Sequence, residues 1–264
     1  MKHSTNDGTV YERNGSGPVV VLLHGLGLNR AMWQWLLPSL TDYFDVVTYD
    51  LWGHGESSKP PSAPNLRLFS DQLVGLLNEI RVNTTAIVGF SIGGMIARRF
   101  AFDYPPRLSA LVILNSAHDR TPIENKAVHI RAEQAYANGP AAMVDAALER
   151  WFTPNFRLEN PETMDLVRGW LEANDPAVYP SIYRVLADGN AELVDIIKRI
   201  ECPTLVMTGE DDIGNSPKMA CRMAGKIPQG RSVILPGLRH MALVEDPDQY
   251  NAHLISFLKT ALYS

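Results

Sequence analysis

The chain has 264 residues, 45% of them hydrophobic and 20% charged, which is typical of a globular protein with a buried core. Its formal net charge of −5 argues against a nucleic-acid partner. No apolar run approaches the roughly 18 residues of a membrane span, and residues 1–14 hold no apolar signal segment, so we expect a cytoplasmic protein without a membrane span.

Six short apolar runs predict buried strands, and helical patterns lie between them. Runs that are apolar throughout, without alternation, are typical of parallel strands covered on both faces. The alternation of strand and helix therefore predicts an α/β fold with a mostly parallel, doubly wound sheet. The predicted strands are 19–23, 46–49, 86–89, 110–114, 204–207 and 233–235, and the predicted helices are 31–41, 67–81, 92–104, 216–226 and 248–261.

The turn His24-Gly25-Leu26-Gly27 follows the first predicted strand. Its glycines permit a tight turn that would present the backbone N–H of Leu26 at the carboxyl edge of the sheet, and an ordinary turn is the alternative. We expect His24 to brace the turn by hydrogen bonding. In the loop after the second predicted strand, we expect Asp50 to be a brace and His54 to lie at the surface.

A Gly-Phe-Ser-Ile-Gly turn at residues 89–93 separates a predicted strand from a predicted helix. In so tight a turn a Cβ at either glycine would clash, and the serine hydroxyl would stand exposed above the sheet edge. This setting predicts that Ser91 is a nucleophile, with a plain glycine-rich turn as the alternative. The N–H groups of Ile92 and Leu26 would then form an oxyanion hole.

The segment 119–190 has no strand-like run and holds four helical stretches. It predicts a helical cap, or lid, over the carboxyl edge of the sheet. The predicted organisation is thus a core of residues 1–118 and 191–264, interrupted by the cap at 119–190. We expect Trp151, Trp170, Met143 and Met164 to line the underside of the cap, with Trp151 contacting substrate, and the alternative for each is a place in the core.

A serine hydroxyl is a poor nucleophile unless a base removes its proton and an acid fixes the tautomer of that base. In sheets of this kind the order along the chain is serine, acid, histidine. Asp212 and His240 follow the fifth and sixth predicted strands, so we expect them at the same edge as Ser91. Asp211 is a second candidate for the acid, because only one of the two neighbours can face His240.

Two further residues are candidates for contacting the substrate. His118 follows the fourth predicted strand, and Met241 follows the predicted base directly. No pair of histidines or carboxylates has the spacing of metal ligands on one face, so we expect no metal. The predicted chemistry requires no cofactor.

Together these motifs resemble those of the α/β-hydrolase superfamily over nearly the whole chain. The chain is most similar to the carboxylesterase and 3-oxoadipate enol-lactonase branch, through residues 90–97 and 147–154. The resemblance implies a serine hydrolase that cleaves esters or lactones of small molecules through an acyl-enzyme, and it leaves open a homo-oligomer. The motifs are His24-Gly25, Asp50-x-x-Gly53-x-Gly55-x-Ser57, Gly89-x-Ser91-x-Gly93-Gly94, Gly209-x-x-Asp212 and Gly237-x-x-His240.

Relatives of other function differ at single residues. Hydrolases that cut a C–C bond in meta-cleavage products usually have Asn before the serine and Trp after the histidine, whereas this chain has Phe90 and Met241. These apolar neighbours predict a preference for esters, unless Arg98, Arg99 or a lid arginine such as Arg131 or Arg184 supplies charge for an acidic substrate. Dehalogenases use an Asp nucleophile, which Ser91 disfavours. A non-catalytic receptor for a small ligand is the alternative of another class.

Overall fold

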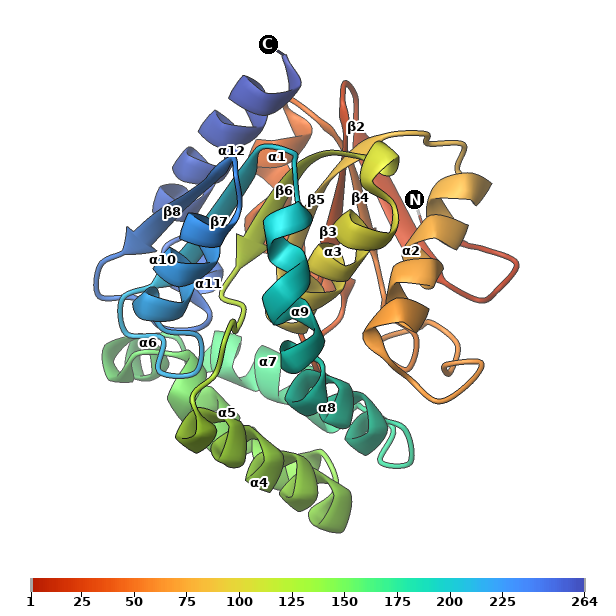
Figure 1. The fold of residues 1–264 in the computed structure, drawn as a ribbon. Helices are drawn as coiled ribbons and strands as arrows, with labels where there is room; N and C mark the ends of the chain where they lie inside the picture. The colour runs from red at the N-terminus through yellow and green to blue at the C-terminus, as the bar shows by residue number, and fades with distance from the viewer. Residues whose placement is uncertain (1, 264) are drawn as a thin grey trace.

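The computed structural model describes residues 2–263 and forms one sheet of eight strands (Figure 1). The order across the sheet is β1-β2-β4-β3-β5-β6-β7-β8, and every pairing from β4 to β8 is parallel. The predicted mostly parallel α/β sheet is therefore confirmed. The strands are β1 (Lys2–Ser4), β2 (Val10–Gly15), β3 (Val19–Leu23), β4 (Asp45–Tyr49), β5 (Thr85–Phe90), β6 (Leu108–Leu114), β7 (Thr204–Gly209) and β8 (Gly230–Leu235).

The first two strands were not predicted from the sequence. β1 and β2 pair antiparallel with each other, and β2 pairs antiparallel with β4, so both lie at one edge of the sheet. Their sequences are KHS and VYERNG, and their residues are exposed or half-buried. An edge strand needs no continuous apolar run, because one of its sides faces solvent.

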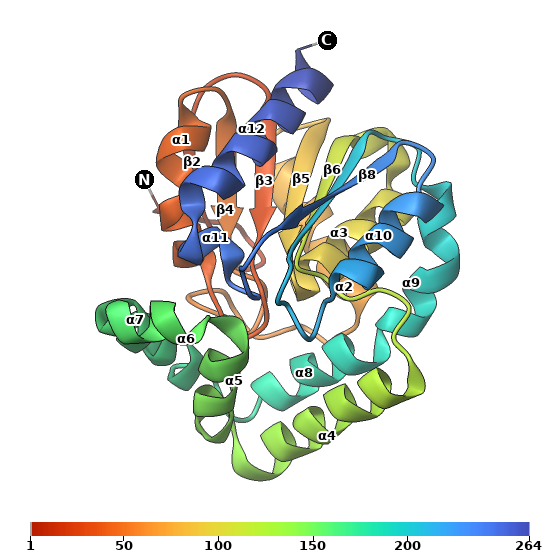
Figure 2. The ribbon, with the colours of Figure 1, turned by 90° about the vertical axis from the view of Figure 1, so that its left-hand side faces the viewer.

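Helices cover both faces of the sheet. Along β3, Val21 and Leu23 belong to one buried cluster and Val20 and Leu22 to the other. The first cluster includes side chains from α2, α3, α9 and α10, and the second includes side chains from α1, α11 and α12. The ribbons of these two groups of helices lie on opposite sides of the sheet in Figure 2. These helices are α1 (Leu37–Thr41), α2 (Leu66–Glu79), α3 (Ile92–Asp103), α9 (Asn190–Ile196), α10 (Pro217–Lys226), α11 (Ala242–Glu245) and α12 (Pro247–Leu262).

The helix predicted over 31–41 is divided in the structure. A short 3₁₀ helix covers Arg30–Trp35, and α1 begins afterwards at Leu37. Pro38 has no N–H to donate to the carbonyl of Gln34, and its ring would clash with that carbonyl in a continuous helix. At the second position of α1, the missing N–H costs nothing.

Five α-helices lie beyond the carboxyl ends of the parallel strands, below the sheet in both Figures 1 and 2. They fall within the segment predicted to form the cap, where the sequence indicated four helical stretches. The division of the chain into a core and a cap stays a prediction. The helices are α4 (Pro122–Asn138), α5 (Val144–Trp151), α6 (Pro154–Glu159), α7 (Pro161–Glu172) and α8 (Tyr179–Asp188).

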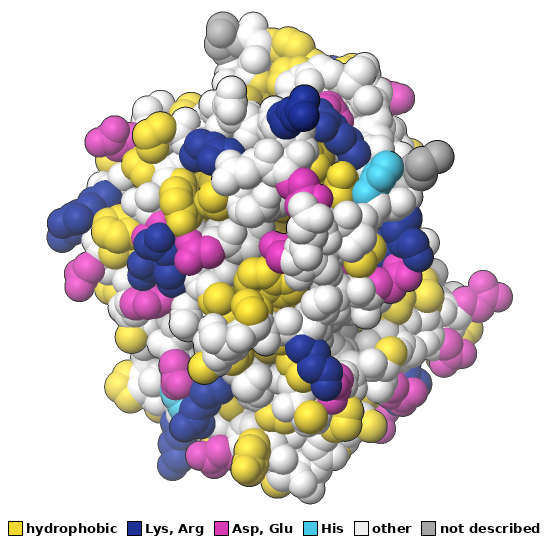
Figure 3. All heavy atoms as spheres, turned by 90° about the vertical axis from the view of Figure 1, so that its right-hand side faces the viewer, with side chains coloured by type: hydrophobic (Ala, Val, Ile, Leu, Met, Phe, Trp, Pro, Cys, Tyr) yellow, Lys and Arg dark blue, Asp and Glu magenta, His cyan; other side chains and the backbone are white. Residues whose placement is uncertain are grey.

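The surface mixes charges of both signs. On the face shown in Figure 3, acidic and basic side chains lie interspersed among neutral ones. Within residues 2–263, no helix combines the length and the apolar character needed to cross a membrane.

Candidate active site

Ser91 occupies a sharp turn between β5 and α3. Its backbone is left-handed, with φ 56° and ψ −115°, a region that non-glycine residues seldom adopt. A Cβ at Gly89 would lie 2.3 Å from the carbonyl oxygen of Gly93, and one at Gly93 would lie 2.4 Å from that of Leu23. The Ser91 N–H donates to the carbonyl of Leu114 at 2.9 Å. The surrounding backbone thus holds the serine in a strained conformation, as is common at functional sites.

Asp212, in the loop after β7, contacts His240, in the loop after β8. The distance from His240 Nδ1 to Asp212 Oδ2 is 2.8 Å, and both side chains are buried. The other carboxylate oxygen accepts the N–H groups of Gly214 and Asn215 at 3.1 and 3.0 Å. Asp211 is exposed, so Asp212 is the neighbour that faces the histidine.

The environment of Asp212 favours its ionised form. Burial opposes ionisation, but the charge and hydrogen bond of His240, together with a hydrogen bond from Asn115, outweigh it and hold the pKa of Asp212 below its usual range. An ionised Asp212 accepts a hydrogen bond from the Nδ1–H group of His240. The neutral ring then has a free lone pair on Nε2, which is the atom a general base requires.

Asn115 is a residue of the site that sequence reasoning missed. Its Nδ2 donates to Asp212 Oδ2 at 3.0 Å, and its Oδ1 accepts the hydroxyl of Tyr250 at 3.1 Å. Asn115 directly follows β6 and has a φ of 46°, which asparagine tolerates better than most residues. The available signal was its position at the carboxyl end of a predicted strand, between the strands that carry Ser91 and Asp212.

Ser91, Asp212 and His240 line one cavity of about 80 Å³, which residues of α4, α5 and α8 also line. The ring of Trp151, from α5, lies 5.7 Å from that of His240. Leu26 borders the same cavity. The remaining lining residues are Gly25, Leu28, Phe90, Arg120, Val128, Arg131, Met143, Ala147, Arg150, Tyr179, Tyr183, Leu186, Gly214 and Asn215.

Two predicted substrate contacts need correction, because His118 and Met241 do not line this cavity. Met241 is fully buried in the apolar core, and its N–H donates to the carbonyl of Trp151 at 2.9 Å. An apolar side chain is more stable in the core than in a polar cavity. His118 is also fully buried, and burial together with the charge of Arg98 lowers the pKa of His118 to about 3.

The expectation of an apolar site also needs correction. Arg120, Arg131 and Arg150 line the cavity from the cap segment. Arg131 was one of the two lid arginines considered in the sequence, but Arg184 points elsewhere and pairs with Asp188 at 3.3 Å. The neighbours of Ser91 in the sequence are apolar, yet the far wall of the cavity is basic.

His24 braces the turn that carries Leu26. The ring donates from Nδ1 to the carbonyl of Gly25 at 2.8 Å, and Nε2 accepts the N–H of Leu51 at 2.9 Å. Within residues 2–263, no group accepts a hydrogen bond from the N–H of Leu26 or of Ile92. Ile92 is the first residue of α3, where an N–H has no partner inside the helix. The oxyanion hole formed by these two N–H groups stays a prediction.

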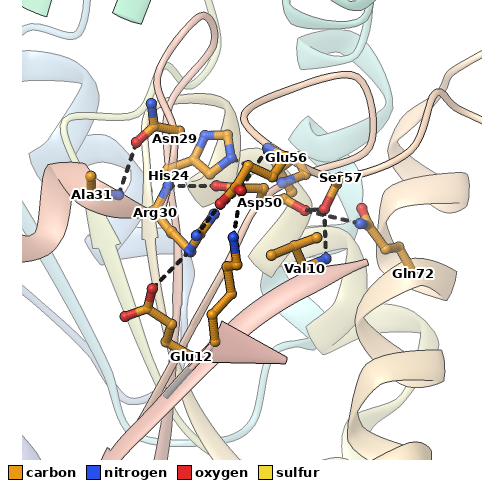
Figure 4. Close-up of polar contacts among 12 residues, drawn as sticks. Val10, Glu12, His24, Asn29, Arg30, Ala31, Asp50, Glu56, Ser57 and Gln72 are labelled. Carbon is orange, nitrogen blue, oxygen red and sulfur yellow. Dashed lines mark hydrogen bonds and ion pairs between the residues drawn. The ribbon is translucent and has the colours of Figure 1, made fainter. Parts of the chain in front are cut away.

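A network of charged and polar side chains holds the loop that follows β4, as Figure 4 shows. Asp50 accepts the N–H of Arg30 at 2.7 Å and that of Glu56 at 2.9 Å. The guanidinium of Arg30 contacts Glu12 at 3.2 Å and pairs with Asp50 and Glu56. The Ser57 hydroxyl donates to the carbonyl of Asp50 at 2.7 Å. The structure therefore places Asp50 and Ser57 as braces of the loop.

His54 was expected at the surface but is buried against His24, with ring centroids 5.1 Å apart. Burial lowers the pKa of His54 to about 3, helped by the adjacent His24, and lowers the pKa of His24 to about 4. The flanking Gly53 and Gly55 carry the loop inward in the left-handed region, with φ 79° and 52°.

We expect the protein to lose stability steeply as the pH falls from about 6.5 to about 4. In that window the unfolded chain protonates His24 and His54, while the folded chain keeps both neutral, so each lowers the free energy of unfolding by up to about 1.4 kcal/mol per pH unit. Urea unfolding at several pH values measures this slope. His54→Asn should make the slope of unfolding free energy against pH shallower by the contribution of one proton, whereas the control His253→Asn, at an exposed position, should leave the slope unchanged. The same slope in His54→Asn and wild type would contradict the assignment.

Three comparisons with known proteins agree with this architecture. The model of the Alpha/beta hydrolase family matches residues 20–253. The chain is 28% identical over 260 residues to the (E)-2-((N-methylformamido)methylene)succinate hydrolase of Acinetobacter baylyi, covering 98% of this chain and 97% of that one. It superimposes on a thermophilic esterase from Thermogutta terrifontis, solved with malate bound, with TM-score 0.88, 27% identity and coverage of 99% and 98%. It also superimposes on the enol-lactonase of Burkholderia xenovorans with TM-score 0.89 and 25% identity, covering 98% of this chain and 100% of that one.

Proposed function

Because the chain belongs to the alpha/beta hydrolase family, we propose that it is a serine hydrolase that cleaves carboxylic esters or lactones of small substrates through an acyl-enzyme. The observation that carries the proposal is the 2.8 Å contact between His240 Nδ1 and Asp212 Oδ2, in the cavity that Ser91 also lines. A hydroxyl on a strained turn, a buried histidine and a buried carboxylate are the parts that nucleophilic acyl transfer requires.

In the proposed mechanism, Ser91 Oγ attacks the carbonyl carbon while His240 Nε2 takes the hydroxyl proton. Asp212 keeps the ring oriented and stabilises the imidazolium that forms. The N–H groups of Leu26 and Ile92 bind the developing oxyanion. His240 then protonates the leaving alkoxide, and afterwards it activates the water that releases the acid from Ser91.

The relatives support this choice of bond. Two of the similar solved structures are an esterase and an enol-lactonase, and one of the similar sequences is that of a succinate-derivative hydrolase. A cavity of about 80 Å³ favours a short acyl group over a long fatty chain. The proposed substrate is therefore a small ester or lactone, used without a cofactor.

Steady-state kinetics on three substrate classes tests the proposal. We expect p-nitrophenyl esters of short acids or enol-lactones to be hydrolysed with a kcat/KM at least about tenfold above that of any meta-cleavage product, about 1.4 kcal/mol in transition-state binding. A meta-cleavage product that matches the best ester would replace this proposal with C–C bond hydrolysis. Tight ligand binding without turnover of any class would favour the receptor alternative.

A further inference from the structure

The cavity that holds Ser91 and His240 receives three cationic side chains from the cap segment. Arg120 directly precedes the capping residue of α4, Arg131 lies on α4, and Arg150 lies on α5. All three line the cavity, and all are partly shielded from solvent. The proposed mechanism uses none of them, so their presence beside the reacting groups requires another explanation.

None of the three has an acidic partner among residues 2–263. Arg120 donates to the carbonyls of Leu186 and Ala187 at 3.0 and 3.4 Å, and Arg150 donates to the carbonyl of Ala146 at 2.7 Å. Half of the fourteen arginines elsewhere in the chain do have such a partner, since carboxylates lie within 4.0 Å of Arg13, Arg30, Arg67, Arg99, Arg168, Arg184 and Arg222.

The positive charge of Arg131 also opposes the charges of Arg120 and Arg150. Burial and the charge of Arg131 lower the pKa of Arg120 to about 10, and burial lowers the pKa of Arg150 as well. The single carboxylate that lines the cavity, Asp212, is already engaged by His240 and Asn115. Buried like charges without counterions are costly, and an entering anion relieves that cost.

We propose that the substrate carries a carboxylate, which Arg131 and Arg150, supported by Arg120, bind while Ser91 attacks the ester or lactone carbonyl. This inference rests on the proposed serine-hydrolase function and names its substrate class. Guanidinium groups bind planar carboxylates through paired hydrogen bonds. Tyr179 and Tyr183 line the same wall, and their phenols add neutral hydrogen-bond donors.

Two nearly isosteric esters test the proposal. Monomethyl succinate carries a carboxylate where methyl 4-oxopentanoate carries a neutral methyl ketone, and both offer the same methyl ester. We expect the purified protein to prefer monomethyl succinate at least tenfold in kcat/KM, as hydrogen bonds to a charged group would produce. Equal values, or a preference for the neutral ester, would overturn the proposal.

Arginine variants test whether these side chains cause the preference for monomethyl succinate. Arg131→Met should lower the ratio of the two kcat/KM values by about tenfold or more, and Arg131→Lys should retain part of it. Arg184→Met is the matched control, because Arg184 is an exposed cap arginine that does not line the cavity, and the ratio should stay at the wild-type value. An unchanged ratio in both Arg131→Met and Arg150→Met would overturn the assignment.

Calorimetry on Ser91→Ala separates this inference from the proposed function. That variant should bind monomethyl succinate at least tenfold more tightly than methyl 4-oxopentanoate, although it cannot hydrolyse either. Equal affinities would overturn the anion site and leave the serine mechanism intact. Rapid hydrolysis by Ser91→Ala would overturn the serine mechanism, whatever the affinities are.

Discussion

Ser91→Ala should abolish ester hydrolysis while the protein stays folded. The substitution removes only the hydroxyl oxygen, so the left-handed turn keeps its side-chain Cβ and its hydrogen bond to Leu114. Loss of the nucleophile from a cooperating triad lowers kcat by roughly 10⁴–10⁶-fold. Initial rates on the best ester measure the effect, and circular dichroism with thermal melting checks the fold.

Ser232→Ala is the control for this experiment. Ser232 lies on β8 and is exposed, so its replacement should leave the rate within about twofold of wild type. Retention of near wild-type hydrolysis by Ser91→Ala would exclude Ser91 as the nucleophile. The nucleophile would then have to be another group that lines the cavity.

Asp212→Asn should lower kcat by roughly 10⁴-fold. The carboxylate at 2.8 Å accepts a hydrogen bond from the Nδ1–H group of His240, whereas an amide in its place can donate a hydrogen bond to that nitrogen. The proton then moves to Nε2, and His240 cannot accept the Ser91 proton. Steady-state kinetics on the same ester measures the loss.

Asp211→Asn provides the matched comparison, since it makes the same chemical change one residue away. Asp211 is exposed, so we expect a rate within about threefold of wild type. A larger loss in Asp211→Asn than in Asp212→Asn would mean that the loop after β7 rearranges and that the acid is misassigned.

Much of the fold was predictable because buried parallel strands leave a simple pattern. Each of the six continuous apolar runs is a strand in the sheet, and their order along the chain placed the loops that follow them at one edge. The antiparallel strands β1 and β2 left no such pattern, since edge strands are largely polar. The division of the helix predicted over 31–41 depended on Pro38 alone.

The site was predictable where chemistry is tied to a turn or to a strand end. The tight turn requires glycine at positions 89 and 93, because a Cβ added at either would collide with backbone atoms. This requirement identifies Ser91, which lies between them, in the sequence. For Asn115 the only signal was its position at the carboxyl end of a predicted strand. The sequences of α4 and α5 could not show that Arg131 and Arg150 meet the cavity, because a helix sequence does not tell which polar face lies against it. His118 has the right position along the chain, yet its side chain is buried away from the cavity.

The walls of the cavity come from separate stretches of chain, and this arrangement affects how the protein can evolve. The reacting groups stand on loops at strand ends, whereas Arg131 and Arg150 stand on the helices α4 and α5. Mutations that replace or shorten those helices, or that change their charges, alter which substrate binds. They leave unchanged the loops that carry the reacting groups. Descendants of one ancestral hydrolase can thus diverge in substrate specificity while they keep the same reaction.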